Sequence, residues 1–89
     1  MNMNQEKHAP RILVVEDDSE LSTSLMLFLE SEDYRVTLAE DGETGREEAT
    51  RLPGYDLIVL DAKLPDRSGF QVLRQARTEG VQTPVLMLT

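Results

Sequence analysis

Acidic residues stand directly after two apolar runs of the chain. The acidic triplet Glu16–Asp18 follows the run Ile12–Val15, and Asp61 follows the run Leu57–Leu60. Carboxylate oxygens are ligands that Mg²⁺ prefers, and a carboxylate can also accept a phosphoryl group covalently. Like charges that lie close together raise each other's pKa, so such a cluster needs a cation to offset the repulsion. The pattern predicts a divalent-cation site suited to phosphoryl transfer.

Each acidic position also has a plainer interpretation. Acidic residues before a helix favour its dipole, and a lone Asp after a strand is often a turn or cap residue. Asp18 fits a helix start, and Asp66 and Ser68 fit a turn or a cap. The joint placement of Glu16, Asp17 and Asp61 favours a binding site only if the two strands before them are neighbours.

The apolar pattern alternates between the periods of strands and helices. Short apolar runs predict strands at 12–15, 34–39, 56–60 and 85–88. Amphipathic spacing and caps predict helices at 20–31, 41–52 and 68–80, with Ser19, Asp41 and Ser68 as N-caps and with Phe28 and Phe70 packed inward. This order predicts an α/β fold: an open parallel sheet with helices on both faces. In such sheets ligands bind beyond the carboxyl ends of the strands, where the acidic residues stand.

Composition narrows the class of protein. The 89 residues make one small domain, with residues 1–10 expected to be a flexible tail and 11–89 the folded part. Asp and Glu number 17 against 9 Lys and Arg, and this net charge of −8 disfavours direct nucleic-acid contact. There is no cysteine, no signal-peptide pattern and no apolar run long enough to span a membrane. These features predict a cytoplasmic protein.

Three stretches resemble the receiver domain of bacterial two-component response regulators. ILVVEDDSEL is similar to the family's first strand and acidic loop, YDLIVLDAKLPDRSGFQVLRQAR to its third strand and acceptor loop, and PVLMLT to its fourth strand. Pro65, Gly69 and Thr89 also stand at the family's spacing, four, eight and twenty-eight residues after Asp61. The resemblance covers residues 11–89 and implies a flavodoxin-like sheet of strand order 2-1-3-4, with the fifth βα unit missing.

The resemblance implies a role for each candidate residue. Asp61 is then the phosphoacceptor of a phosphorelay, phosphorylated by a sensor histidine kinase in a Mg²⁺-dependent reaction. Asp17 binds the metal directly, Glu16 acts nearby through a water, and Asp61 and the backbone carbonyl of Lys63 complete the protein ligands. Thr89 hydrogen-bonds the phosphoryl group. Such a domain turns over no external substrate, so it is not expected to be an enzyme.

The sequence also departs from the family pattern. The family's fourth helix, fifth strand with its lysine, and fifth helix have no counterpart after Thr89. Without that lysine, phosphorylation is expected to be slow, unstable or absent. The fourth strand becomes an exposed edge, which invites pairing with another chain. We therefore expect either self-association or a fragment of a longer protein, by analogy a transcription regulator with a separate output domain.

Two other functions compete with the phosphoacceptor hypothesis. One is an interaction domain whose pocket is vestigial. The other is a phosphatase-like hydrolase with Asp61 as nucleophile, which Lys63 disfavours because such enzymes carry a second acid at that position. Nucleotide binding is disfavoured as well, because the loop after the first strand lacks a Gly-rich phosphate cradle.

Overall fold

The structure is a computed structural model that describes residues 9–89. Its elements in chain order are β1 (Arg11–Val15), α1 (Ser19–Ser31), β2 (Arg35–Ala39), α2 (Gly42–Ala49), β3 (Leu57–Asp61), α3 (Gly69–Thr78) and β4 (Val85–Leu88). All strands are parallel, in the order β2-β1-β3-β4. The predicted α/β class and strand order are confirmed.

The predicted flexible tail lies almost wholly outside the described residues, which begin at Ala9. Pro10, the last residue of that predicted tail, accepts a hydrogen bond from the backbone N–H of Arg35 at 2.9 Å. The sheet therefore engages the chain one residue before β1 begins.

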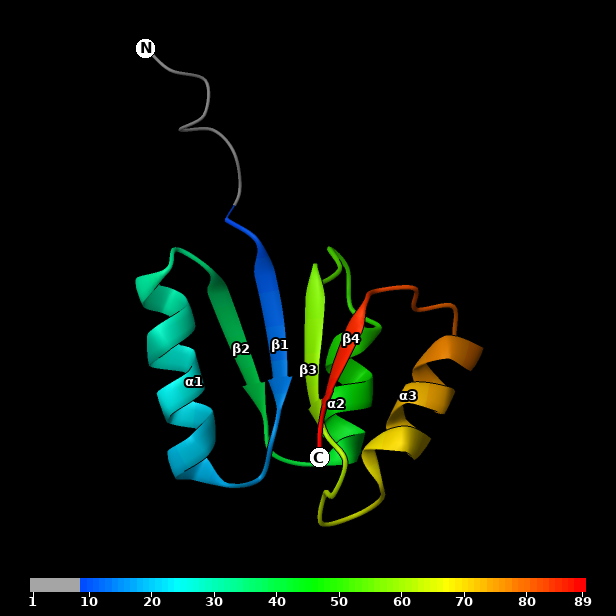
Figure 1. Cartoon of the computed structure of the whole chain (residues 1–89). Helices are drawn as coiled ribbons and strands as arrows, with labels where there is room; N and C mark the ends of the chain where they lie inside the picture. Colours follow the sequence, from blue (N-terminus) through cyan, green and yellow to red (C-terminus); the bar gives the residue numbers. More distant parts are fainter. Residues whose placement is uncertain (1–8) are drawn as a thin grey trace.

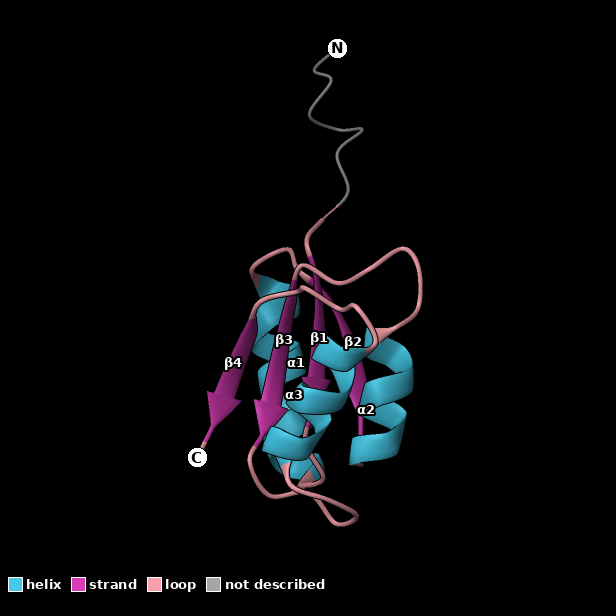
Figure 2. Ribbon diagram, turned by 90° about the vertical axis from the view of Figure 1, so that its right-hand side faces the viewer, coloured by secondary structure: helices cyan, strands magenta, loops and turns pink. Residues whose placement is uncertain are grey.

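The helices cover the two faces of the sheet unequally. Figure 2 shows α2 and α3 in front of the sheet and α1 behind it. Alternate residues of β1 enter two separate hydrophobic clusters: Leu13 and Val15 pack on the α2–α3 side, and Ile12 and Val14 on the α1 side. All four side chains are buried, which confirms a strand covered on both faces.

The register of the sheet places the ends of β1 and β3 side by side. Val15 is the partner of Leu60 across these two strands, so Glu16 and Asp61 follow at the same edge of the sheet. At the next strand Asp61 is itself the partner of Leu88. Figure 1 accordingly shows the C-terminus next to the carboxyl end of β3.

Some predicted helix ends are wrong. Asp18, not Ser19, is the N-cap of α1: its Oδ1 accepts from the backbone N–H groups of Glu20 at 3.0 Å and Leu21 at 3.2 Å. Helix α2 ends at Ala49 instead of Leu52. The residue before a proline is driven away from helical geometry, and the side chain of Leu52 is 90% exposed, so no burial holds a further turn.

The predicted inward packing of both phenylalanines is also wrong. Phe28 is 63% exposed and Phe70 is 51% exposed. Each residue turns a helix by about 100°, so a position next to the inward stripe leaves the core. Helix α3 instead buries Val72 and Ala76, and α1 packs Leu25 and Leu29 against the sheet. No helix of residues 9–89 has the length and apolar content needed to cross a membrane.

Candidate functional site

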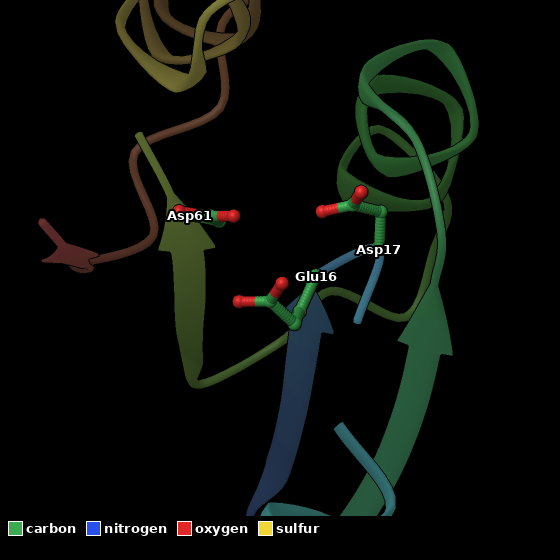
Figure 3. A group of neighbouring side chains, drawn as sticks. All are labelled: Glu16, Asp17 and Asp61. Atoms are coloured by element: carbon green, nitrogen blue, oxygen red, sulfur yellow. The ribbon is translucent and has the colours of Figure 1, made fainter. Parts of the chain in front are cut away.

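Three carboxylates converge at the carboxyl ends of β1 and β3. One oxygen each of Glu16, Asp17 and Asp61 lies within 4.8 Å of the others. Figure 3 shows the three side chains directed toward one another from the two strand ends. The strands that precede these carboxylates, β1 and β3, are neighbours in the sheet, as a shared binding site requires. Asp18 does not join them, because its carboxylate caps α1.

The three side chains lie at different depths. Glu16 is buried, Asp61 is partly buried and Asp17 is exposed. Burial raises the pKa of Glu16, and the negative charges of Asp61 and Asp17 raise it further. A hydrogen bond from the backbone N–H of Asp18 to Oε2 of Glu16, at 3.0 Å, partly lowers this pKa again. Burial thus makes it costly for Glu16 to remain charged, and a cation would offset that cost.

The donor set fits a hard divalent cation. All three side chains offer oxygen, as Mg²⁺ requires, and Mg²⁺ commonly binds through one or two carboxylates while keeping several waters. Among residues 9–89 the ion pairs of the protein use other carboxylates, those of Glu43, Glu48, Asp66 and Glu79. No side-chain cation of the described chain therefore neutralises the cluster.

The loop after β3 folds back tightly on the strand end. The backbone N–H of Lys63 donates to Oδ1 of Asp61 at 3.2 Å, and the N–H of Gly69 donates to the carbonyl of Ala62 at 2.8 Å. A Cβ on Gly69 would lie 2.1 Å from the carbonyl oxygen of Asp61. Only glycine allows α3 to begin this close to the strand, a constraint that the sequence spacing did not explain.

Lys63 and Thr89 are near the cluster but are not among its three carboxylates. Lys63 follows Asp61 by two residues and is exposed. Thr89 comes directly after Leu88, the strand partner of Asp61. The roles of the Lys63 carbonyl and the Thr89 hydroxyl remain predictions.

One residue near the site has a contact that no sequence pattern signalled. Asp66, predicted to be a turn or cap residue, accepts from the backbone N–H groups of Gly42 at 2.7 Å and Glu43 at 2.9 Å. These hydrogen bonds, that from Gly42 first, lower the pKa of Asp66. Asp66 is thus a cap, but for a helix more than twenty residues earlier in the chain.

Known proteins agree with this geometry. The family model described as the response regulator receiver domain matches residues 12–89. The cell cycle response regulator CtrA of Brucella ovis is 44% identical over 79 residues, which are 89% of this chain and 34% of that protein. The chain thus spans about a third of the length of the curated relatives it matches.

Solved receiver structures are similar as well. The receiver domain of sensor histidine kinase PA1611 from Pseudomonas aeruginosa PAO1, with a magnesium ion coordinated in its active site cleft, is 35% identical with a TM-score of 0.85, covering 91% of this chain and 67% of that one. TrrA from Thermotoga maritima, in complex with Mg²⁺–BeF, is 32% identical with a TM-score of 0.82, covering 90% and 69%. The family model matches nearly the whole length of this chain, residues 12–89, and the carboxylates lie at the predicted strand ends. This chain therefore belongs to the response regulator receiver domain family.

Proposed function

We propose that this receiver domain accepts a phosphoryl group on Asp61 from a histidine kinase, in a reaction that requires Mg²⁺. The observation that carries the proposal is the convergence of Glu16, Asp17 and Asp61 within 4.8 Å. A single partly buried carboxylate beside two others has little structural reason to be there, whereas a metal-assisted acceptor site uses all three.

Asp61 is suited to act as the nucleophile. It is partly buried, so its carboxylate remains open to a donor, and the N–H of Lys63 holds Oδ1 at 3.2 Å. In the proposed transfer a carboxylate oxygen forms a bond to phosphorus as the bond between phosphorus and the kinase imidazole breaks. The imidazole leaves as a neutral group after protonation, and Asp61 becomes an acyl phosphate.

The metal ligands in this proposal are Asp17, Asp61 and the backbone carbonyl of Lys63, with Glu16 acting through a water. The chemistry that bound Mg²⁺ supplies is neutralisation of the negative charge on the phosphoryl oxygens. Glu16 sits deepest and faces both other carboxylates, which suits a residue that orients the site from below. Thr89, at the adjacent strand end, is proposed to donate its hydroxyl to the phosphoryl group.

Intact mass after incubation with a small-molecule phosphodonor tests this proposal. Wild type is expected to gain one phosphoryl group only with Mg²⁺ present, and Asp61→Asn to gain none. Asp33→Asn is the matched control, because Asp33 lies in an exposed turn at φ 70°, a conformation that Asn tolerates, and should behave as wild type.

The absence of any gain in a wild-type sample that circular dichroism shows to be folded would contradict the proposal. It would favour the alternative of an interaction domain with a vestigial pocket. A gain that persists in Asp61→Asn would place the acceptor elsewhere.

The wider setting is also part of the proposal. The partner is a sensor histidine kinase in the cytoplasm, and the domain serves as a signalling module that turns over no external substrate. Since the chain spans 34% of CtrA, we propose that the output, transcriptional regulation by analogy, is carried by another part of the protein. Cognate-kinase phosphotransfer to purified wild type, followed by the same mass measurement, tests the partner class.

A further inference from the structure

The acceptor loop consists of residues 62–68, between β3 and α3. Its tip, formed by Asp66 and Arg67, is attached to the start of helix α2. Oδ1 of Asp66 accepts from the N–H of Gly42 at 2.7 Å, and its Oδ2 accepts from the N–H of Glu43 at 2.9 Å. The first N–H groups of a helix have no partner inside the helix, so they are strong donors to an outside carboxylate. Asp66 lies five residues after Asp61, on the same loop as Lys63.

Two aspartates divide the capping of α2 between them. Asp41, the residue before the helix, accepts from the N–H of Thr44 at 2.7 Å through Oδ1. Asp66 takes the two N–H groups that Asp41 leaves. Only Asp66 ties the helix to the acceptor loop, because Asp41 belongs to the chain that leads into α2.

The fit between the loop tip and the helix start is close. A Cβ on Gly42 would lie 2.6 Å from Cγ of Arg67 and 3.0 Å from Oδ1 of Asp66. Arg67 adds contacts on both sides: its Nη1 lies 3.3 Å from Oε1 of Glu43 and donates to Oε1 of Gln75 at 2.8 Å. The tip is thus held between α2 and α3.

The base of the same loop is held independently. The Gly69 N–H donates to the carbonyl of Ala62 at 2.8 Å, and Lys63 and Ser68 form an antiparallel bridge. Lys63 therefore belongs to the fixed base and leads directly into the tip that Asp66 attaches to α2. Its backbone position depends on both attachments, since a short loop held at two ends has few conformations.

From this arrangement we infer that Asp66 is a positioning residue for the metal site: by joining the acceptor loop to α2 it fixes the backbone at Lys63. The inference rests on the proposed function, in which the Lys63 carbonyl is a metal ligand. Residues that orient metal ligands typically contribute about tenfold or more to metal affinity. Asp66 would act in this way without touching the metal.

Mg²⁺ titration by calorimetry, with Asp66→Ala, Asp66→Asn and Asp41→Ala, tests the inference. Asp66→Ala is expected to weaken Mg²⁺ binding about tenfold. Asp66→Asn keeps one acceptor and should fall between Asp66→Ala and wild type. Asp41→Ala removes a cap from the same helix but leaves the loop attached, so its Mg²⁺ affinity should equal that of wild type.

A metal-free measurement separates loop position from affinity. In ¹H–¹⁵N spectra without Mg²⁺, the amide resonances of Lys63 and Leu64 should move in Asp66→Ala and stay in place in Asp41→Ala. Gly42→Ala displaces the contact from the helix side and should move the same loop resonances. Should Asp66→Ala fail to fold, Asp66→Asn and Gly42→Ala carry the test.

Distinct outcomes separate this inference from the proposed function. Wild type that binds Mg²⁺, with equal affinity in the Asp66 variants, would overturn the inference alone. Equal weakening in Asp41→Ala and Asp66→Ala would also overturn it, because general loss of α2 stability would then suffice. Folded wild type that does not bind Mg²⁺ at all would overturn the proposed function and this inference with it.

Discussion

Glu16 differs from its two acidic neighbours in depth. It is 5% exposed, and its carboxylate accepts a hydrogen bond from the N–H of Asp18, whereas Asp17 is exposed to solvent. A buried carboxylate that faces two other negative charges destabilises the folded state when it is ionised. The site therefore contains charge repulsion that no side-chain cation of residues 9–89 offsets.

Glu16→Gln should change the pH dependence of stability in the absence of Mg²⁺. In the folded state the pKa of Glu16 is raised above its ordinary value of 4.5. At a pH above the raised pKa Glu16 is ionised in the folded protein, and this ionisation lowers the free energy of unfolding. The lost stability returns as the pH falls toward 4.5 and Glu16 becomes protonated. The Gln side chain stays neutral and can still accept from Asp18. Glu16→Gln should be more stable than wild type at neutral pH, and the difference should shrink toward pH 4.5.

Urea unfolding with a chelator present, at neutral pH and near pH 4.5, measures this difference directly. Comparing the two proteins at each pH cancels the titration of the groups that do not interact with Glu16. A Glu16→Gln protein that is less stable than wild type at neutral pH would show that ionised Glu16 does not destabilise the folded state.

Gly69→Ala should be strongly destabilising. Its Cβ would lie 2.1 Å from the carbonyl oxygen of Asp61, a backbone atom that cannot move without shifting β3. We expect a loss of about 3 kcal/mol in the free energy of unfolding, the upper range for overpacking. Gly54→Ala is the control, because no atom lies within 4 Å of its Cβ position, and it should be nearly neutral. Equal urea midpoints for the two variants would refute the close-approach argument.

At the scale of elements, the residues that cap the helices also hold the loops next to them. Asp18, Asp41 and Ser68 each cap one helix, and the carboxyl-end loops that lead into α1 and α3 contain the site residues. Each cap ties a loop to a rigid element, so loss of a cap frees the adjacent loop as well as the first turn.

Ser68→Ala should cost about 1 kcal/mol, the usual value for an N-cap. Ser68 and Gln71 form a reciprocal capping box: the Ser68 hydroxyl accepts from the Gln71 N–H at 3.1 Å, and Oε1 of Gln71 accepts from the Ser68 N–H at 2.9 Å. Ser24→Ala, at an exposed position inside α1, should be neutral or slightly stabilising. The melting temperatures of both variants and of wild type test this prediction. A Ser68→Ala protein with the melting temperature of wild type would mean that the capping box contributes nothing to stability.

At the scale of the whole molecule, the proposed metal site links binding to folding. A ligand that binds only the folded state raises the free energy of unfolding by about 2.7 kcal/mol at one hundred times its dissociation constant. MgCl₂ should therefore raise the melting temperature more than NaCl at equal ionic strength, and Asp17→Asn should lose most of that gain. Identical melting curves in the two salts would contradict Mg²⁺ binding.

The sheet has two edge strands, β2 and β4, and the apolar side chains of β4 are only partly covered. β4 lies at the end of the strand order, and its Leu86 is 54% exposed. Unpaired strand edges and exposed apolar groups favour association, so the chain should self-associate as its concentration rises. Leu86→Lys should reduce this in sedimentation velocity, while Leu27→Lys, on the exposed side of α1 at 60% exposure, should not. A compact monomer at every concentration would rule the prediction out.

Much of this molecule follows from local patterns in its sequence. Apolar runs and helical spacing predicted seven elements in the right order, because periodicity reflects which side chains can face a core. Acidic residues after two strands predicted a site at the carboxyl edge, because parallel strands end together. The strand order itself came from the family resemblance.

Tertiary structure decided what local patterns cannot encode. The 5% exposure of Glu16 depends on how β1 is enclosed, and the outward direction of Phe28 depends on where α1 meets the sheet. The attachment of Asp66 to Gly42 joins segments 24 residues apart. Periodicity reports which face of an element is apolar, but only the packed chain determines which distant groups that face meets, since such contacts depend on every other element at once.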